Sequence, residues 1–154
     1  MEKEVVPKAV FENMIKHLVH IEEEKDKILS EYYSAITAER MAFELFITDY
    51  IKKIEEYIAN CQASETVNDF FPRIIIGSTV EIYDMQYNEA EKYQVISPFG
   101  NNILPRTLTA SHLSPMGRAL LHKKPNETVI VDTPAGQFTY KILSIEMFEE
   151  PSGS

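Results

Sequence analysis

The sequence predicts an α+β protein, in which an N-terminal antiparallel helical coiled-coil hairpin is followed by a twisted antiparallel sheet domain with one short helix. Glycine and proline are strongly segregated along the chain. Before residue 72 there is no glycine and one proline, Pro7, whereas all five glycines and the remaining prolines lie from Pro72 onward. Apolar residues recur every three or four positions in the first part, as in helices, and alternate with polar residues in the second, as in strands.

The first part, residues 1–63, is expected to form the hairpin. Pro7 stands where a helix can begin, because the first helical position has no use for the missing N–H group. The apolar stripe is narrow, as in a coiled-coil seam. We assign to it Phe11, Ile15, Leu18, Ile21, Ile28, Met41, Leu45, Ile51, Ile54, Ile58 and Cys61.

The bend of this hairpin is inferred, because no glycine turn marks it. Arms of equal length between Pro7 and Gln62 would meet near residues 33–36. The alternative is an unbroken helix over residues 8–62, a rod of about 80 Å that would bury its stripe in a homodimer. A monomer with a hairpin is favoured over this dimer.

The second part is expected to be a sheet domain over residues 74–150, joined to the hairpin by a linker at 64–73. Alternating segments predict strands at 79–85, 91–97, 127–133 and 137–145. Thr133-Pro134-Ala135-Gly136 suits a tight turn, with proline second and glycine fourth, so the last two strands are predicted to form a hairpin.

A short helix is predicted within the segment SPMGRALLHKKPN, residues 114–126. Ser114 suits the N-cap and Pro115 the first helical position. The basic residues His122, Lys123 and Lys124 favour the C-terminal end of this helix, and Pro125 and Asn126 would end it.

Size and charge narrow the function classes. The 154 residues, 44% hydrophobic and 25% charged, suit one ordinary domain or two small ones. No apolar run approaches the roughly 20 residues that span a bilayer, and MEKEVVPK lacks signal-peptide features, so we expect a cytoplasmic protein without a membrane partner. The net charge is −9 and basic residues do not cluster, so a protein or a metal is the expected partner rather than nucleic acid directly.

Few residues suggest chemistry of their own. His17, His20 and Glu24 share a helical face but lack the HExxH pattern, so packed or solvent-facing histidines are expected. The single cysteine, Cys61, permits no internal disulfide and is expected to be a buried thiol. A GxSxG elbow and a glycine-rich phosphate loop are both absent from the sequence. A conventional hydrolase or nucleotide-binding enzyme is therefore not supported, and no stably bound cofactor is expected.

The segment ISPFGNNILPRTLTASHLSPMGRALLHKKPNETVIVDTPAGQFTYKILSIE closely resembles the C-terminal domain of the bacterial Gre transcription elongation factors. The resemblance rests on SP-M/I-x-RAL, followed by V-x-V-x-TP-x-G and a last strand, and spans about residues 74–148. ERMAFELFITDYIKKIEEYIANCQ, residues 39–62, is similar to the returning helix of that family's N-terminal hairpin. The resemblance implies an FKBP-like sheet domain, without prolyl isomerase activity, behind the coiled coil.

The resemblance also implies a regulator of RNA polymerase. Such factors dock by the C-terminal domain at the secondary channel and meet nucleic acid only through the polymerase complex. The loop and helix start at Leu113, Ser114, Pro115 and Met116 resemble the polymerase contact. The family's hairpin tip carries acidic residues that help the polymerase hold a catalytic Mg²⁺, and the polymerase then cleaves RNA.

The tip is where this sequence departs from the family. The ungapped register from IKKIEE puts Ser30 and Tyr33 where the two metal-facing acids stand, with Glu31 as the acid between them. Asp26 and the triple glutamate then lie about two turns back, as a solvated face. A shifted tip that joins Asp26 with Glu31 at a polymerase-held Mg²⁺ stays open. The predicted function is therefore a channel-binding elongation regulator with weak or no stimulation of cleavage, and the alternative is a cleavage-stimulating factor.

Overall fold

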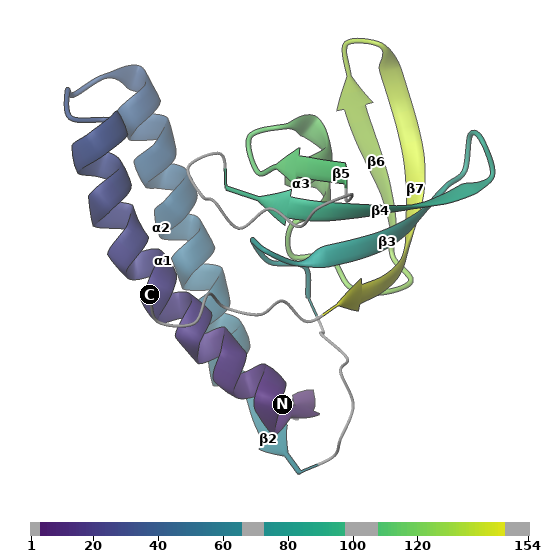
Figure 1. Ribbon diagram of the computed structural model, residues 1–154, viewed down its shortest axis with the longest axis horizontal. Helices are drawn as coiled ribbons and strands as arrows, with labels where there is room; N and C mark the ends of the chain where they lie inside the picture. The colour runs from purple at the N-terminus through teal and green to yellow at the C-terminus, as the bar shows by residue number, and fades with distance from the viewer. Residues whose placement is uncertain (1–3, 66–72, 98–107, 147–154) are drawn as a thin grey trace. The chain divides into compact units, whose positions relative to one another are not determined.

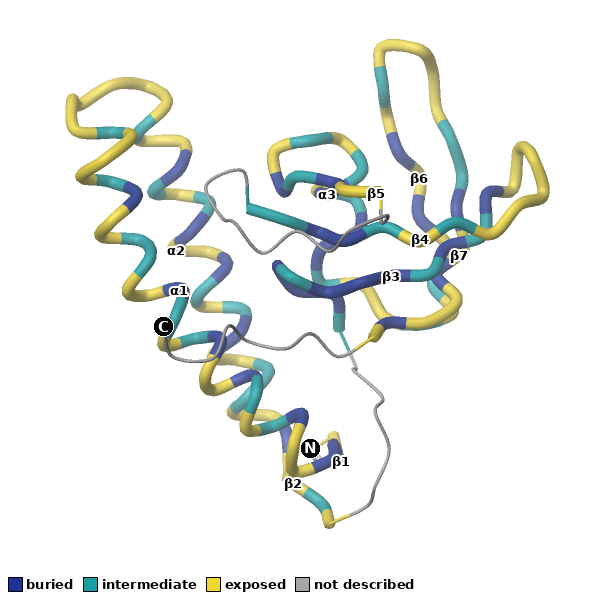
Figure 2. Tube along the Cα trace, in the orientation of Figure 1, coloured by how far each residue is buried: buried dark blue, intermediate teal, exposed yellow. Residues whose placement is uncertain are grey.

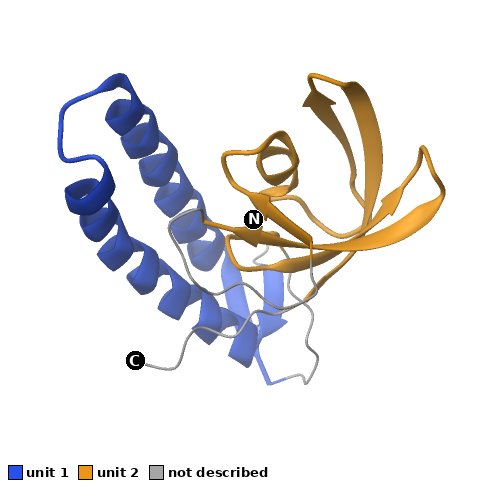
Figure 3. Cartoon of the chain, turned by 45° about the horizontal axis from the view of Figure 1, so that its top comes forward, with its two compact units in different colours: residues 1–68 blue, residues 69–154 orange. Residues whose placement is uncertain are grey.

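The computed structural model describes residues 4–65, 73–97 and 108–146 (Figure 1). It divides the chain into two compact units, residues 1–68 and 69–154 (Figure 3). The predicted fold class, a helical hairpin followed by a sheet with one short helix, is confirmed. Most of the predicted linker, residues 66–72, and the end of the predicted sheet domain, residues 147–150, lie outside the described residues.

The first unit is an antiparallel pair of helices closed at its base by two short strands. It comprises β1 (Glu4–Pro7), α1 (Lys8–Tyr32), α2 (Ala38–Ala59) and β2 (Cys61–Ser64). The helices are joined by residues 33–37, which confirms the predicted position of the bend, and the unbroken rod is wrong because α2 packs back on α1 (Figure 1). β1 and β2 pair in parallel, with Glu4 opposite Cys61, and were not predicted because each strand is too short to show alternation.

The seam between the helices runs in a different register from the prediction. Its buried residues are Val10, Met14, His17 and Ile21, then Ile28 on α1 and Phe43, Ile47, Tyr50 and Ile54 on α2. Ile21, Ile28, Ile54 and Cys61 were assigned correctly to the interior, but Ile15, Met41 and Leu45 are exposed. The dark stripes on α1 and α2 in Figure 2 mark the seam.

Two polar residues explain this register. The imidazole Nε2 of His17 and the hydroxyl of Tyr50 are 2.6 Å apart in a buried hydrogen bond across the seam. Their rings meet edge to face, with centroids 5.8 Å apart. A buried polar pair that satisfies itself is tolerated in a helix interface. Because the prediction assigned only apolar residues to the seam, it chose a face of each helix that is rotated away from the observed one.

The second unit is a five-stranded sheet in the order β5-β4-β3-β7-β6. Its elements are β3 (Thr79–Asp84), β4 (Glu89–Ile96), β5 (Leu108–Ser111), α3 (Pro115–Leu120), β6 (Thr128–Thr133) and β7 (Gly136–Glu146). The pairs β3–β4, β3–β7 and β6–β7 are antiparallel, whereas β4 and β5 are parallel. The four predicted strands and the β6–β7 hairpin are confirmed, and β5 was missed.

The core of this unit lies on the face of the sheet that carries Val80 and Ile82 on β3 and Ile142 and Ile145 on β7, all buried. Register shifts between Glu81 and Ile82 opposite β7, so a bulge lets both strands keep apolar residues on this face. α3 packs against β5, β6 and β4 and adds the buried Leu120.

Helix α3 is shorter than predicted. Its start agrees with the prediction, because the amide of Gly117 donates to the Ser114 hydroxyl at 3.1 Å and Pro115 is the first helical residue. It ends at Leu120 rather than near Asn126, because the backbone of Leu121 is no longer helical. The side chain of Leu121 is buried. Gly117 lies against β5, where an added Cβ would clash with the Ser111 carbonyl oxygen, so a larger residue would force the helix from the strand.

Candidate functional site

The loop at the end of the helical hairpin, residues 33–37, is held by contacts with the start of α2. Thr37 is the N-cap of α2, and its hydroxyl accepts a hydrogen bond from the amide of Arg40 at 3.2 Å. Tyr33 stacks on Phe43 of α2, with ring centroids 5.2 Å apart and ring planes at 20°. The first residue of the loop is thus fixed by packing and the last by capping.

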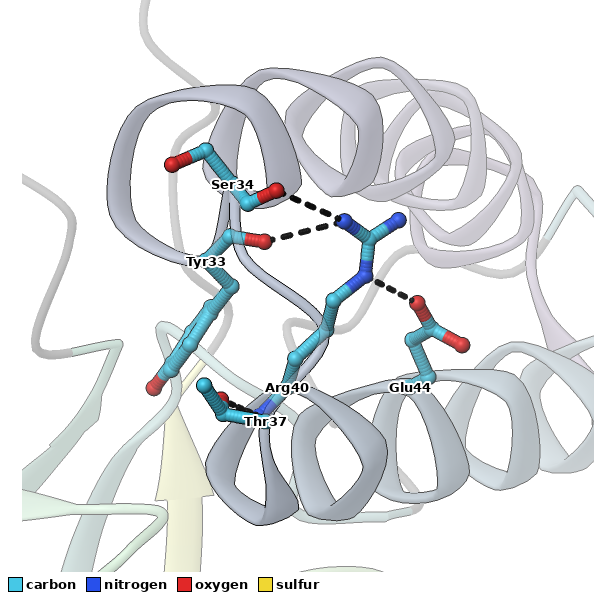
Figure 4. Close-up of polar contacts among 5 residues, drawn as sticks. All are labelled: Tyr33, Ser34, Thr37, Arg40 and Glu44. Carbon is cyan, nitrogen blue, oxygen red and sulfur yellow. Dashed lines mark hydrogen bonds and ion pairs between the residues drawn. The ribbon is translucent and has the colours of Figure 1, made fainter.

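Arg40 connects the two helix ends (Figure 4). Its Nη1 donates to the carbonyl oxygen of Tyr33 at 3.1 Å and lies 3.5 Å from that of Ser34, while its Nε donates to the Glu44 carboxylate at 2.8 Å. The last carbonyls of a helix lack partners within the helix, and a cation at that end also meets the negative end of the helix dipole. Arg40 of α2 therefore satisfies a carbonyl group at the end of α1, a role that a glycine C-cap motif has in other helices.

The loop at the tip carries exposed apolar side chains and no charge of its own. The segment 32–37 reads YYSAIT and contains no acidic or basic side chain. Ile36 is 87% exposed and Tyr32 is 57% exposed. Met41 and Leu45 follow on α2, 59% and 74% exposed, on the side of that helix away from the buried Phe43 and Ile47. Exposed apolar groups gathered in one place mark interaction sites more often than scattered ones do.

Ser30 and Tyr33, the positions predicted to align with metal-facing acids, offer no carboxylate. Ser30 lies in the last turns of α1, and its hydroxyl donates to the carbonyl of Lys27 at 3.0 Å. Tyr33 is engaged with Phe43. These two side chains are accounted for by the local structure of the hairpin.

Carboxylates do flank the loop. Glu31 is exposed in the last turn of α1, where the helix dipole disfavours a negative charge. Asp26 is exposed on the same unbroken helix, five residues earlier, which places it about 140° around the axis from Glu31. Glu39, in the first turn of α2, was not considered from the sequence, although its place one residue after a helix start was a readable signal. Its charge is explained by the dipole of α2.

The predicted docking segment, Leu113–Met116, lies at the start of α3. Leu113 and Pro115 are exposed and Met116 is half-buried. Ser114 is occupied structurally: its hydroxyl donates to the Ser111 carbonyl at 2.7 Å while accepting from Gly117. The apolar side chains of Leu113 and Met116 are therefore the part of this segment that is available for contact.

A buried histidine stands directly before this segment. His112 is enclosed in the sheet unit, and burial lowers the pKa of its imidazole from 6.5 to about 4, with a smaller contribution from the positive charge of Arg118. The ring is therefore neutral at neutral pH.

Other candidates do not form a metal site within the described part of the chain. His17 is buried against Tyr50 and His20 is half-buried, and no group of three or more histidine, cysteine or acidic residues is placed to hold a metal there. Cys61 is buried in β2, as the predicted core thiol. Over the described residues, no helix is long and apolar enough to cross a membrane.

The chain has the architecture that the resemblance implies, a helical hairpin followed by a curled sheet with a serine-capped helix. The family model for the C-terminal domain of the GreA/GreB transcription elongation factors matches residues 71–147, half of the chain. The chain belongs to the GreA/GreB family, and the resemblance seen in the sequence is confirmed.

Individual relatives are moderately similar. GreA of Caldanaerobacter subterraneus subsp. tengcongensis is 34% identical over 107 residues, which cover 66% of this chain and 64% of that protein. GreA of Thermoanaerobacter pseudethanolicus gives the same values, so the match spans less than two thirds of the length of these relatives. Among solved structures, GreA factor homolog 1 of Thermus thermophilus is 26% identical with a TM-score of 0.42, covering 95% of this chain and 100% of the other. The GreA/GreB factor of Nitrosomonas europaea is 16% identical with a TM-score of 0.47, covering 94% and 100%.

Proposed function

We propose that this protein binds RNA polymerase at its secondary channel and regulates elongation while stimulating transcript cleavage weakly or not at all. Membership of the GreA/GreB family supports elongation control. Any RNA cleavage would be performed by the polymerase, so the protein is not itself an enzyme, and its contact with nucleic acid is through the polymerase complex. A hairpin that buries its seam within one chain supports a monomeric factor.

The observation that carries the mechanism is the chemistry of the tip. A hard cation such as Mg²⁺ takes oxygen ligands, preferably carboxylates. The aligned positions hold Ser30 and Tyr33, the loop 33–37 carries no charge, and the guanidinium of Arg40 bonds to the loop backbone. A tip of this composition supplies few ligands for a catalytic metal. The same hairpin can still occupy the channel and exclude a factor that supplies them.

Glu31 favours a second candidate, a cleavage-stimulating factor with a non-standard tip. Its carboxylate is exposed at the negative end of the α1 dipole, where it does not stabilise the helix. Helix stability thus gives no reason for an acid at this position, and ligation of a polymerase-held Mg²⁺ would give one.

The two candidates separate in an assay of backtracked elongation complexes with purified polymerase. We expect the unaltered protein to release little cleaved RNA and to reduce cleavage by a competent Gre factor as its concentration rises. Replacing Ser30→Asp and Tyr33→Glu together should install the missing pair and raise cleavage. Loss of the Tyr33–Phe43 stack is an accompanying cost, so the helix content of the double variant is compared with that of Tyr33→Gln, which loses the stack without adding an acid.

The result that would overturn the first candidate is strong cleavage by the unaltered protein. If that cleavage is abolished by Glu31→Gln, the second candidate is correct, and Asp26→Gln serves as a matched control on the same helix. Absence of any polymerase binding would contradict both.

A further inference from the structure

The tip patch, which we define as Tyr32, Ile36, Met41 and Leu45, consists of exposed apolar side chains at the bend of the hairpin and on the first turns of α2. Loops at the ends of helices are normally polar, because their backbone and side chains face water. Here the loop presents a β-branched aliphatic side chain, Ile36, with 87% of its surface accessible. Local structure gives no reason for an isoleucine at that position, since its side chain packs little on the hairpin.

The loop beneath this patch is prepared for contact. Three interactions hold it: the Thr37 cap and the Arg40 bond to the Tyr33 carbonyl, both drawn in Figure 4, and the Tyr33–Phe43 stack. The Arg40–Glu44 ion pair lies within α2 and orients the guanidinium. A loop that is already ordered loses little conformational entropy when it binds. Ile36 thus lies in a loop whose first and last residues, Tyr33 and Thr37, are both held by contacts with α2.

From this arrangement we infer that the tip patch docks in a concave apolar site of RNA polymerase and so gives the end of the hairpin an apolar contact with the enzyme. The inference rests on the proposed function. The four exposed apolar side chains fit an apolar wall, and the exposed carboxylates of Glu31 and Glu39 lie outside the uncharged segment 32–37, where they can stay in water at the rim of such a contact.

The size of the patch favours polymerase over a second copy of the chain. A stable interface between proteins uses about 20–30 residues on each side, and the tip offers four apolar side chains. Alone it is too small to hold a dimer together. It suits a secondary contact made by a protein whose sheet unit has already bound the same partner, because the second contact is then intramolecular.

The test compares Ile36→Gln with Ile15→Gln in the full-length protein. Ile15 is also exposed, at 40%, on α1, and lies 17 residues before the end of that helix, about 26 Å away along its axis. Affinity for core polymerase is measured for both variants and for Ile36→Leu, which keeps an apolar side chain. Circular dichroism checks that helix content is unchanged, as expected for a side chain that is almost wholly exposed.

We expect Ile36→Gln to bind about tenfold more weakly, from loss of a buried aliphatic group, while Ile36→Leu and Ile15→Gln bind as the unaltered protein does. The loss should persist at high salt, because it is not electrostatic. Equal affinity of Ile36→Gln and the unaltered protein would overturn the inference and leave the proposed function intact, whereas no binding by the unaltered protein would remove the proposed function itself. A dimer in sedimentation that Ile36→Gln dissociates would make a second copy the occupant and also overturn the inference.

Discussion

Arg40→Ala removes the side chain that ties the end of α1 to the start of α2. The guanidinium donates to the Tyr33 carbonyl at 3.1 Å and to Glu44 at 2.8 Å. Without it, the carbonyl at the end of α1 returns to water, and the loop keeps only the Thr37 cap and the Tyr33–Phe43 stack. We expect the helical hairpin to be less stable while keeping its fold.

The magnitude follows from the separate contacts. A hydrogen bond from a charged donor contributes about 1.5–3 kcal/mol, and the lower end applies because the Arg40 side chain is 29% exposed. The Arg40–Glu44 pair adds about 0.3–0.5 kcal/mol as an exposed i,i+4 ion pair. The contact with Ser34 at 3.5 Å is too long to add much. Alanine regains about 0.2 kcal/mol in helix propensity, so the net loss is about 1.7 kcal/mol.

Urea unfolding followed by far-ultraviolet circular dichroism measures this loss, because helix dominates that signal and the long helices lie in the first unit. Glu44→Ala is the matched control, since it removes the ion pair and leaves the carbonyl bond, and should cost only about 0.3–0.5 kcal/mol. If Arg40→Ala costs no more than Glu44→Ala, the guanidinium does not hold the end of α1 and the account of a rigid tip is wrong.

Two further predictions concern the sheet unit. Leu113→Asp with Met116→Asp should weaken binding to polymerase at least tenfold without unfolding the protein, because both side chains lie outside the Ser114 cap. The control is Ile130→Asp on β6, where the side chain is 61% exposed and binding should not change. Equal effects of the two changes in a pull-down would contradict the predicted contact. For His112, the unfolded chain has the higher pKa, near 6.5 against about 4 when folded, so its contribution to stability is complete above about pH 6.5 and is lost as the pH falls towards 4. Between about pH 7 and about pH 5 the free energy of unfolding should fall by about 2 kcal/mol through this group. His112→Gln should therefore make the urea midpoint depend less on pH over that range. An unchanged pH dependence would show that the imidazole is not the group responsible.

The architecture was predictable because its main determinants are local. The segregation of glycine and proline separates a helical unit from a turn-rich one, and Thr133–Gly136 specifies the β6–β7 hairpin through its own turn chemistry. β5 and the β1–β2 pair were not predictable in this way. Each is four residues long, too short for a period to be read, and each is held by parallel pairing with a distant strand.

The candidate site was predictable in position but not in construction. Equal arm lengths place the bend correctly, and the alignment that sets Ser30 and Tyr33 at the acid positions stays a prediction. The sequence alone does not reveal that Arg40 closes α1, because an arginine seven residues beyond Tyr33 has many partners open to it until the loop folds. The role of Ser114 in its own cap was readable, and the structure adds that this leaves Leu113 and Met116 for contact.

The error in the seam register and the character of the tip have one physical origin. His17 and Tyr50 occupy seam positions as a hydrogen-bonded pair, so the apolar residues that flank them on each helix are not all needed in the interior. Continuing the seam of α2 back from Phe43 by three residues reaches Arg40, which turns towards the end of α1, and the same rotation turns Met41 and Leu45 outward. The register that buries a polar pair therefore also places an arginine under the loop and apolar side chains on the outer side of α2. A hairpin in the register first predicted would bury Met41 and Leu45 and would present no apolar surface there.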